Sequence, residues 1–339
     1  MTFSILVTGG AGYIGSHMVK LLTHRGHQVT VFDNLSTGHR DAVSGADFVE
    51  GDLRLEADAA RAFDGRQIDA VMHFAASCYV GESVQDPAKY YTNNVIGTLN
   101  LLEAMRAAKV QRLVFSSTCS TYGDPVSLPM NEDHPQQPVN PYGMSKLTAE
   151  RAMADYGRAY GLGTVALRYF NAAGCDPEGE LGERHDPETH LIPLILREAL
   201  RVRGGGKPED TQLQVFGDDF DTPDGTCVRD YVHIADLCTA HLLAMGRSLG
   251  GNVSGFNAFN LGTGNGYSVK EVIETCRRVT GQDIRYRIAA RRAGDPARLV
   301  ASATRARSEL GWSPEFDKLS AIVETAWRWF ARQPSPVIE

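Results

Sequence analysis

The chain has 339 residues, of which 42% are hydrophobic and 22% are charged. At about 150 residues per domain, this length predicts two domains, each large enough to bury its own core. The formal net charge is −7, and the sequence has neither a long basic run nor an apolar stretch of membrane-spanning length, which argues against a nucleic-acid partner and against an integral membrane protein.

The first half of the chain alternates short β-branched runs with helical stretches. Six runs predict strands, at residues 4–8, 28–32, 47–50, 68–74, 112–116 and 164–168. Near-continuous apolar strands joined by helices are typical of a parallel sheet that is covered on both faces. The sequence therefore predicts an α/β fold with a doubly wound parallel sheet of the Rossmann type.

Two helices are expected over residues 94–108 and 143–160. Spacings of three and four residues place one set of side chains along one side of each helix. In the first helix this set is Val95, Leu99, Leu102 and Met105, and in the second it is Met144, Leu147, Arg151 and Ala154. These sides are candidates for a helix-on-helix homodimer interface. Burial within one chain explains the same periodicity.

The character of the sequence changes after Asn171. Turn-rich segments at residues 177–180, 204–206 and 218–225 separate shorter helices and strands. We expect a smaller mixed α+β lobe at the carboxyl edge of the sheet. The predicted domains are residues 1–171, to which a few later strands and helices return, and residues 172–339.

The cysteines give a prediction about the compartment. None of the six has a Cys-x-x-Cys neighbour, so we expect neither a disulfide framework nor a metal site. The first residues lack the basic region of a signal peptide. These features predict a protein of the reducing cytoplasm.

Gly9, Gly12 and Gly15 lie between the first predicted strand and a helix expected over residues 13–25. A G-x-x-G-x-x-G turn here lets the backbone approach a pyrophosphate closely, and the helix N-terminus offers free N–H groups and a partial positive charge. The strand before the turn and the helix after it favour a dinucleotide site over a purely structural turn.

Two aspartates extend this pattern. Asp33 ends the second predicted strand, where a carboxylate accepts hydrogen bonds from the adenosine ribose and repels a 2′-phosphate, so NAD is preferred over NADP. The other interpretation is a turn cap, because Asn34 and Ser36 follow. Asp52 follows the third strand and is a candidate acceptor for the adenine amine, or an ordinary turn residue.

Tyr142 and Lys146 form a Tyr-x-x-x-Lys motif that places both side chains on one helical face. A nearby ammonium group favours the phenolate and lowers the pKa of a tyrosine, which makes it a usable base. A Ser/Thr cluster at 116–121 ends the fifth predicted strand, at the edge where such sheets bind ligands. Some of these hydroxyls are expected to form ordinary turns, and Cys119 is expected to be buried rather than nucleophilic.

Together these motifs resemble those of the extended short-chain dehydrogenase/reductase superfamily. Within it, the sequence is most similar to the NAD(P)-dependent epimerase/dehydratase family, and in that family to the UDP-glucose 4-epimerases. The similarity covers essentially the whole chain. The glycine turn and the Tyr-x-x-x-Lys motif are common to the superfamily. The segments 228–233 (VRDYVH) and 291–295 (RRAGD) are more specific to the epimerase group.

The resemblance implies epimerisation with a permanently held NAD. Tyr142, as phenolate, would remove the proton of the sugar 4-hydroxyl while C4 gives its hydride to NAD⁺. Thr118 would hydrogen-bond that oxygen, and Lys146 would hold the nicotinamide ribose. The 4-keto sugar would rotate about its link to UDP and take the hydride back on its other face, which interconverts UDP-glucose and UDP-galactose.

The resemblance also implies the binding residues, with residues 1–171 as the NAD-binding domain and 172–339 as the UDP-sugar-binding domain. The cofactor site would comprise Gly9, Gly12, Tyr13, Ile14, Gly15, Asp33, Asn34, Asp52, Leu53, Phe74, Ala75, Ala76, Asn93, Tyr142, Lys146 and Phe170. The substrate site would comprise Thr118, Tyr142, Asn171, His190, Phe216, Arg229, Arg292, Asp295 and Leu299. In this arrangement Arg229 and Arg292 would clamp the diphosphate, Phe216 would pack on the uracil and Asp295 would hold the uridine ribose. From the residues alone, either arginine is equally well a solvated surface charge.

The chain departs from the family pattern at four positions. Cys78 stands where a lysine often reaches the cofactor, and Thr118 stands where serine is common. His190 replaces a frequent substrate-binding asparagine. Leu299 occupies a position where tyrosine would exclude N-acetylated sugars and a small residue would admit them, so that leucine leaves the choice of sugar open.

Three other functions are alternatives to the interconversion of UDP-glucose and UDP-galactose. A nucleotide-sugar 4,6-dehydratase needs an acid beside the Ser/Thr hydroxyl, but Cys119 and Ser120 stand there and the next carboxylate is Asp124. An epimerase of UDP-N-acetylhexosamines or UDP-pentoses would share every catalytic residue. A redox-sensing NAD-binding regulator would be expected to lack Tyr142 or Lys146.

Overall fold

The computed structural model describes residues 1–251, 253–292 and 294–333. Its centre is a sheet of seven parallel strands, in the spatial order β10 (Phe256–Leu261), β6 (Gly163–Tyr169), β5 (Arg112–Thr118), β4 (Ala70–His73), β1 (Ser4–Thr8), β2 (Gln28–Asp33) and β3 (Asp47–Glu50). The strand order reverses between β1 and β4, which creates the switch point where open α/β sheets bind ligands. The predicted doubly wound sheet is confirmed.

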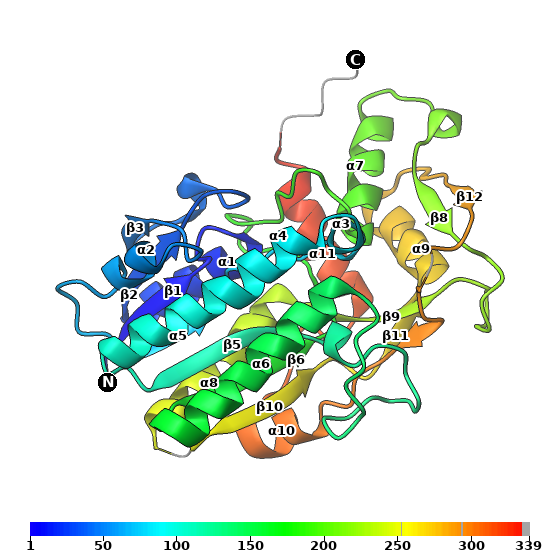
Figure 1. Ribbon diagram of the computed structural model, residues 1–339. Coiled ribbons are helices and arrows are strands. Elements are labelled where there is room, and N and C mark those ends of the chain that lie inside the picture. The colour runs from blue at the N-terminus through cyan, green and yellow to red at the C-terminus, as the bar shows by residue number, and fades with distance from the viewer. Residues whose placement is uncertain (252, 293, 334–339) are drawn as a thin grey trace.

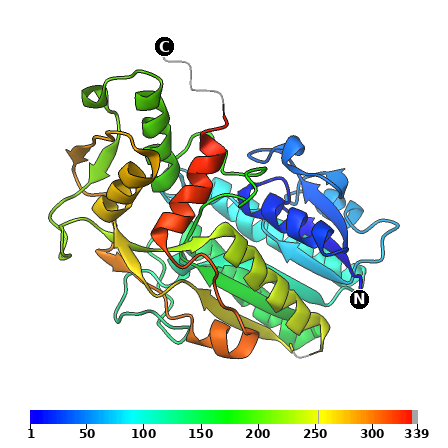
Figure 2. The same cartoon turned by 180° about the vertical axis from the view of Figure 1, so that it is seen from behind.

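Helices cover both faces of the sheet (Figures 1 and 2). One face carries α1 (Tyr13–His24) and α8 (Ile234–Leu249), and the other carries α2 (Glu56–Arg61), α5 (Gly97–Ala107) and α6 (Pro141–Tyr160). In β1, Ile5 and Val7 are buried against the first layer and Leu6 against the second. The strand therefore alternates between two cores, and both cores are apolar.

Helix α6 has clear start and stop signals. The Asn140 side chain accepts a hydrogen bond of 2.8 Å from the backbone N–H of Gly143, and Pro141 occupies the first turn. The helix ends at Gly161, which has φ of 76° and so adopts the left-handed conformation that suits glycine. The helix predicted over residues 143–160 is thus confirmed, with two more residues at its start.

The other long predicted helix is interrupted. Short helices α3 (Val80–Gln85) and α4 (Pro87–Tyr90) lead into a π-helix, η2 (Tyr91–Ile96), and only then does α5 begin. The helix predicted over residues 94–108 is therefore regular only from Gly97. The wider π turn matters for the site, because it carries the buried residue Asn94.

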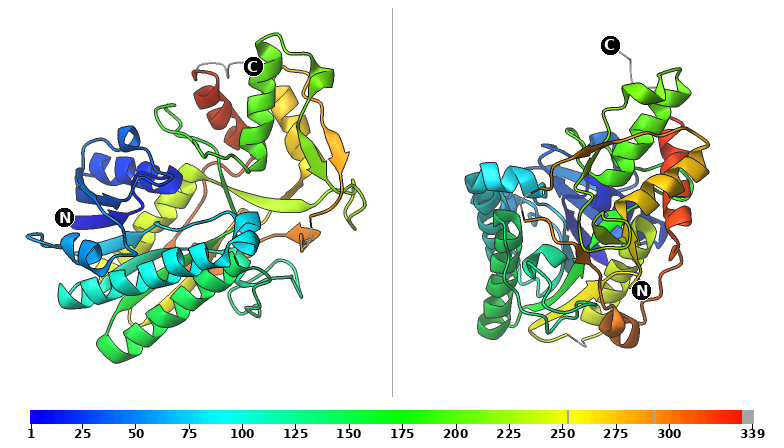
Figure 3. Two further views of the ribbon diagram at one scale, coloured as in Figure 1. Left: turned by 45° about the horizontal axis from the view of Figure 1, so that its top comes forward. Right: turned by 90° about the vertical axis from the view of Figure 1, so that its right-hand side faces the viewer.

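The remaining elements form a smaller lobe (Figure 3). Its strands are β7 (Asn171–Ala173), β9 (Val228–His233), β11 (Gly266–Ser268) and β13 (Arg298–Leu299), joined in one sheet around β9, and the pair β8 (Gln214–Phe216) and β12 (Arg287–Ala289). Its helices α7 (Leu191–Arg203), α9 (Val269–Thr280) and α11 (Leu319–Phe330) share a separate apolar core. The predicted mixed α+β lobe is therefore present.

Three elements of the second half of the chain pack with the central sheet rather than with the lobe. They are α8, β10 and α10 (Thr304–Leu310). The division into domains 1–171 and 172–339 stays a prediction. Within the described residues, no helix combines the length and apolar character that a bilayer crossing requires.

Candidate active site

The glycine turn packs tightly against the switch point of the sheet. Gly9 has φ of 73°, and a Cβ on it would lie 2.4 Å from the backbone nitrogen of Ala75. A Cβ on Gly15 would lie 2.1 Å from the carbonyl oxygen of Gly9. Gly12 caps α1 without a side-chain hydrogen bond, so the first N–H groups of the helix are free to bind an anion. These features fit a dinucleotide pyrophosphate.

Residues predicted around the cofactor surround this turn. Tyr13 donates a 2.5 Å hydrogen bond from its hydroxyl to the carbonyl of Gly174, which ties α1 to the second half of the chain. Ile14 packs on the core beneath α1. The backbone nitrogens of Phe74 and Ala75 both donate to the carbonyl of Thr8, so the ends of β1 and β4 are joined next to the turn, and Ala76 continues from there.

Asp33 is fixed by the backbone of the glycine turn. Its carboxylate accepts hydrogen bonds of 2.9 Å from the N–H of Ala11 and 2.8 Å from the N–H of Leu35. Burial raises the pKa of Asp33, although these hydrogen bonds act in the opposite direction. Asp33 therefore closes the turn itself and holds a carboxylate at the end of β2.

Asp52 lies beyond Asp33, after β3. Asn34 donates to its carboxylate at 3.2 Å, and Arg54 pairs with it at 2.5 Å and lowers its pKa to about 2. The backbone N–H of Arg54 also donates to Asp52, which is the ordinary turn arrangement. Leu53 is buried and packs against Gly97 at the start of α5.

Thr118 and Tyr142 meet at the carboxyl end of β5. Both side chains are buried, and the two hydroxyl groups lie close enough to interact. Burial raises the pKa of Tyr142 well above its usual value, and the nearby Thr118 hydroxyl acts to lower it. Tyr142 is therefore a neutral phenol at physiological pH unless positive charge is brought next to it.

Lys146 lies one helical turn after Tyr142 and is also buried. Its ammonium group donates a 3.0 Å hydrogen bond to the carbonyl of Ser116 and lies 4.7 Å from the ring centroid of Phe115. Burial lowers the pKa of Lys146 to about 8. His73 stacks with the same Phe115 ring at 5.5 Å.

A buried network under these residues was not predicted. Glu150, one turn beyond Lys146, accepts hydrogen bonds from Ser117 at 2.5 Å and from Arg168 at 2.9 and 2.6 Å. Arg168 also donates to the hydroxyl of Tyr122. The i, i+4 spacing of Glu150 from Lys146 was the one available signal in the sequence.

The π-helix supplies a second unpredicted contact. Asn94 donates to the carbonyl of Ser77 and to the hydroxyl of Ser145, each at 3.0 Å, and accepts from the N–H of Ser77 at 2.8 Å. It therefore fixes the segment after β4 to α6, next to Tyr142. Asn93, which was predicted on the cofactor side, donates to Asn94 at 3.1 Å.

Phe170 connects the catalytic candidates to the smaller lobe. It is buried in an apolar cluster with Cys119 and Tyr122, and Leu299 packs against that cluster. Asn171 begins β7 and donates a 2.9 Å hydrogen bond to the carbonyl of Asp230. Cys119 is buried, and burial raises the pKa of its thiol to about 12, so it is no nucleophile.

The predicted diphosphate and uridine residues gather in the lobe. The side chain of Arg229 is only 12% exposed and pairs with Asp295, so Arg229 is not a solvated surface charge. The guanidinium carbon of Arg292 lies 4.0 Å from the ring centroid of Phe216. In β9 and β13, Arg229 is in register with Leu299.

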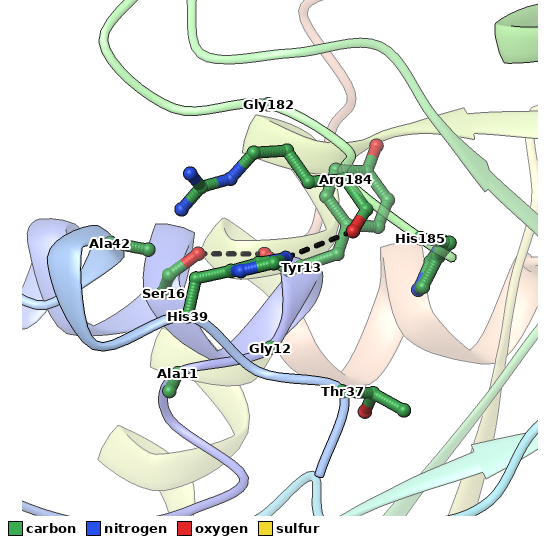
Figure 4. Close-up of a pocket in the computed structure, with 10 residues that line it drawn as sticks. All are labelled: Ala11, Gly12, Tyr13, Ser16, Thr37, His39, Ala42, Gly182, Arg184 and His185. Atoms are coloured by element: carbon green, nitrogen blue, oxygen red, sulfur yellow. Dashed lines mark hydrogen bonds between the residues drawn. The ribbon is translucent and has the colours of Figure 1, made fainter. Parts of the chain in front are cut away.

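A loop from β7 to α7 crosses the start of α1. The backbone carbonyl of Arg184 accepts a 3.0 Å hydrogen bond from His39, and its guanidinium makes two hydrogen bonds to Asp41. Figure 4 shows this loop passing over the first turn of α1, near Gly12 and Tyr13. Farther along, the same loop places His190 beside Glu183 and Glu188, neither of which was predicted.

Known proteins with this sequence pattern share its fold and length. Residues 5–262 match the NAD dependent epimerase/dehydratase family. The UDP-glucose 4-epimerase of Halalkalibacterium halodurans is 51% identical over 331 residues, which cover 98% of this chain and 96% of that relative.

Two solved structures extend the comparison. UDP-glucose 4-epimerase from Brucella ovis, in complex with NAD, is 49% identical with a TM-score of 0.91 and covers 97% of this chain and 98% of its own. The enzyme from Bifidobacterium longum, in complex with NAD⁺ and UDP, is 37% identical with a TM-score of 0.90, over 98% and 99% of the two chains. The chain therefore belongs to the NAD dependent epimerase/dehydratase family, alongside the UDP-glucose 4-epimerases that it resembles.

Proposed function

We propose that this protein is an NAD-dependent epimerase that interconverts UDP-glucose and UDP-galactose. The observation that carries the proposal is the adjacent buried pair of Thr118 and Tyr142, with Lys146 one turn away, at the strand ends beside an uncapped helix N-terminus. A base, a hydroxyl donor and a dinucleotide cradle together fit hydride chemistry at a carbinol carbon.

The residues at the switch point would hold NAD. The free N–H groups of Tyr13 and Ile14 would bind the pyrophosphate, whereas the N–H of Gly12 already donates to the carbonyl of Gly9. Asp33 would receive the adenosine ribose hydroxyls. Lys146 would hold the nicotinamide ribose. Bound NAD would supply the acceptor, and later the donor, of the hydride at sugar C4.

The chain's own groups would move the proton. Tyr142 would take the proton of the 4-hydroxyl during oxidation and give it back to the same oxygen during reduction, so that no net proton is consumed. Thr118 would hydrogen-bond that oxygen as hydroxyl and as ketone. The positive charge of Lys146 and of the nicotinamide would favour phenolate, against the burial that raises the pKa of Tyr142.

The smaller lobe would hold the nucleotide while the sugar turns. Arg229 and Arg292 would bind the diphosphate, because guanidinium groups match phosphate oxygens in geometry and charge. Phe216 would stack on the uracil, and Asp295 would bind the uridine ribose. Asn171 and His190 would line the space between the lobe and the sheet.

The decisive test is turnover of UDP-galactose deuterated at C4, by purified protein without added cofactor. We expect UDP-glucose to form with the deuterium retained at C4, and NAD to be released when the protein is denatured. Loss of the deuterium to solvent, or a protein that neither carries nor responds to NAD, would refute the proposal.

The proposal also concerns which sugar the site accepts, and Leu299 is the residue that bears on it. Leu299 packs against the cluster of Phe170 and Tyr122, and its size lies between those of alanine and tyrosine. Parallel assays with UDP-hexoses, UDP-N-acetylhexosamines and UDP-pentoses would rank the candidates by kcat/KM. A preference for N-acetylated sugars or pentoses would change the substrate but leave the mechanism intact.

We further propose a homodimer in the cytoplasm. Five apolar side chains on neighbouring elements α3, η2 and α6 are between 39% and 64% exposed: Val80, Val84, Tyr91, Ile96 and Met144. A second copy of the same surface would bury them. All six cysteines are free thiols, which suits a reducing compartment. Light scattering of the wild type and of Val84→Glu would test the dimer.

A further inference from the structure

The loop before α7 contains a compact cluster of two glutamates and two histidines. The cluster consists of Glu183, His185, Glu188 and His190. One ring nitrogen or carboxylate oxygen from each of these residues lies within 4.8 Å of the others. The ring nitrogen Nδ1 of His190 is 2.9 Å from an oxygen of Glu183 and 2.9 Å from an oxygen of Glu188. His190 therefore has both carboxylates on the same nitrogen.

The two carboxylates are buried, whereas the histidine is not. The side chain of Glu183 is 5% exposed and that of Glu188 is fully buried, but the side chain of His190 is 42% exposed. Since Nδ1 is occupied by the carboxylates, the exposed part of the ring presents Nε2. The ring of Tyr79 lies 6.3 Å away, in the segment that Asn94 fixes to α6.

Hydrogen bonds fix the carboxylate of Glu188 in this position. One of its oxygens accepts hydrogen bonds of 2.8 Å from the backbone N–H groups of both Thr189 and His190, in addition to that from the imidazole. Its other oxygen is buried without a hydrogen-bond partner among the described residues. A buried carboxylate needs a nearby positive charge, and the imidazole rings of this cluster are the groups placed to provide it.

We propose that Glu183 and Glu188 hold His190 as a permanent imidazolium, whose Nε2–H is a charged hydrogen-bond donor for the diphosphate of the nucleotide sugar. This inference rests on the proposed function, because it assigns the charge to the same substrate pocket. Glu183 and Glu188 are positioning residues in it, since they act through His190.

The surroundings of His190 agree with a charged ring. Partial burial opposes the charge, but the hydrogen bonds that the ring donates to Glu183 and Glu188 outweigh it and raise the pKa of His190 to about 11. His185 and His190 in turn lower the pKa of Glu183, against the effect of its burial. The other titratable groups that face the ring are Cys78, Tyr79 and His185.

The charge on His190 determines how diphosphate binding depends on pH. Below its folded pKa, His190 stays charged, so diphosphate binding by the wild type should not change between pH 6 and 9. When both carboxylates become amides, the pKa of His190 should fall toward its ordinary value of about 6.5, and the donor should lose its charge above neutral pH.

The first experiment is nitrogen NMR of the NAD-loaded protein with ¹⁵N-labelled histidine, with His190→Asn used to assign the signal. We expect both ring nitrogens of His190 to carry protons at pH 8. A His190 that titrates near pH 6.5 overturns the proposal, as does a tightly bound transition metal that is lost in His190→Asn. This readout is independent of turnover, so it stands even if the proposed epimerisation is wrong.

The second experiment measures KM and kcat for UDP-galactose at pH 6 and pH 8.5. In Glu183→Gln/Glu188→Gln we expect KM to rise about tenfold at pH 8.5 but little at pH 6, with kcat nearly unchanged, because a charged donor binds phosphate better than a neutral one. His190→Asn should raise KM at both pH values.

The matched control is Glu178→Gln, an exposed carboxylate of the same loop, which should leave both profiles unchanged. A double variant with an elevated KM that does not depend on pH would mean that the carboxylates only shape the loop, and would refute the proposal. If the double variant does not fold, the NMR titration of the wild type still decides.

Discussion

Glu150 and Arg168 form a buried ion pair directly beneath the candidate catalytic residues. The guanidinium donates to both carboxylate oxygens, at 2.9 and 2.6 Å, and the side chains are only 2% and 5% exposed. The pair joins α6, which carries Tyr142 and Lys146, to β6. Through Ser117 it also joins β5, which carries Thr118.

Glu150→Ala should therefore destabilise the protein strongly. Removing one partner leaves a buried guanidinium without its counter-charge, which costs about 3–5 kcal/mol. Urea unfolding would measure the loss. Asp155→Ala removes half of the exposed pair with Arg158 on the same helix and should cost less than about 1 kcal/mol; equal losses for the two variants would contradict the structural role of the network.

Tyr142→Phe should abolish epimerisation and leave the cofactor bound. The variant keeps the ring but removes the proton acceptor, so activity should fall by at least about a thousandfold, while NAD released on denaturation stays equal to that of the wild type. Tyr160→Phe, at the exposed end of α6, is the control and should retain full activity. Substantial activity in Tyr142→Phe would remove Tyr142 from its assigned role.

Gly15→Ala should disrupt the cofactor turn. Its Cβ would lie 2.1 Å from the carbonyl oxygen of Gly9, so the turn must shift, at a cost of about 1–3 kcal/mol or more. We expect purified Gly15→Ala to carry little NAD. Gly246→Ala in α8 meets no atom within 4 Å and should keep its NAD and gain stability by about 0.5–1 kcal/mol.

Lys146 should make the stability of the cofactor-free protein depend on pH. Burial lowers its pKa from 10.5 to about 8, so between these values the unfolded chain binds a proton that the folded protein does not. This contribution makes stability rise with pH from about 8 to 10.5, while below pH 8 the cost of burying the charge is fully present. Urea unfolding at pH 7 and 9.5 should show a smaller pH effect in Lys146→Met than in the wild type.

Leu299 should control the acceptance of N-acetylated sugars. Leu299→Ala enlarges the space beside Phe170 and should raise kcat/KM for UDP-N-acetylglucosamine, relative to UDP-glucose, by about tenfold. Leu299→Tyr should lower the same ratio. If the two variants shift the ratio in the same direction, Leu299 does not face the sugar.

Local signals account for most of what the sequence predicted correctly. The apolar strands, the glycine turn and the helical pattern over residues 143–160 all depend on neighbours in the chain, so they can be recognised without the fold. The Tyr142–Lys146 pair needs only the helical repeat. The Ser/Thr cluster was predicted to lie at the ligand-binding edge of the sheet, and Thr118 was singled out within it only by the family resemblance.

The contacts that the sequence did not predict join distant segments. Glu150 meets Ser117 and Arg168 only after three elements have packed together. Asn94 required a π turn, which has no reliable sequence signal. His190 was predicted from a family resemblance, but the carboxylates beside it depend on how one loop folds back on itself.

Strand β10 has a consequence for synthesis on the ribosome. Its six residues pair with β6 along its length, although the two strands are separated by the whole of α7, β8, β9 and α8. A nascent chain that has emerged only as far as Tyr169 exposes β6 as an open edge. The nucleotide-binding half therefore cannot finish folding until residue 261 has left the exit tunnel, and nascent chains stalled before that point should be prone to aggregate and should bind chaperones.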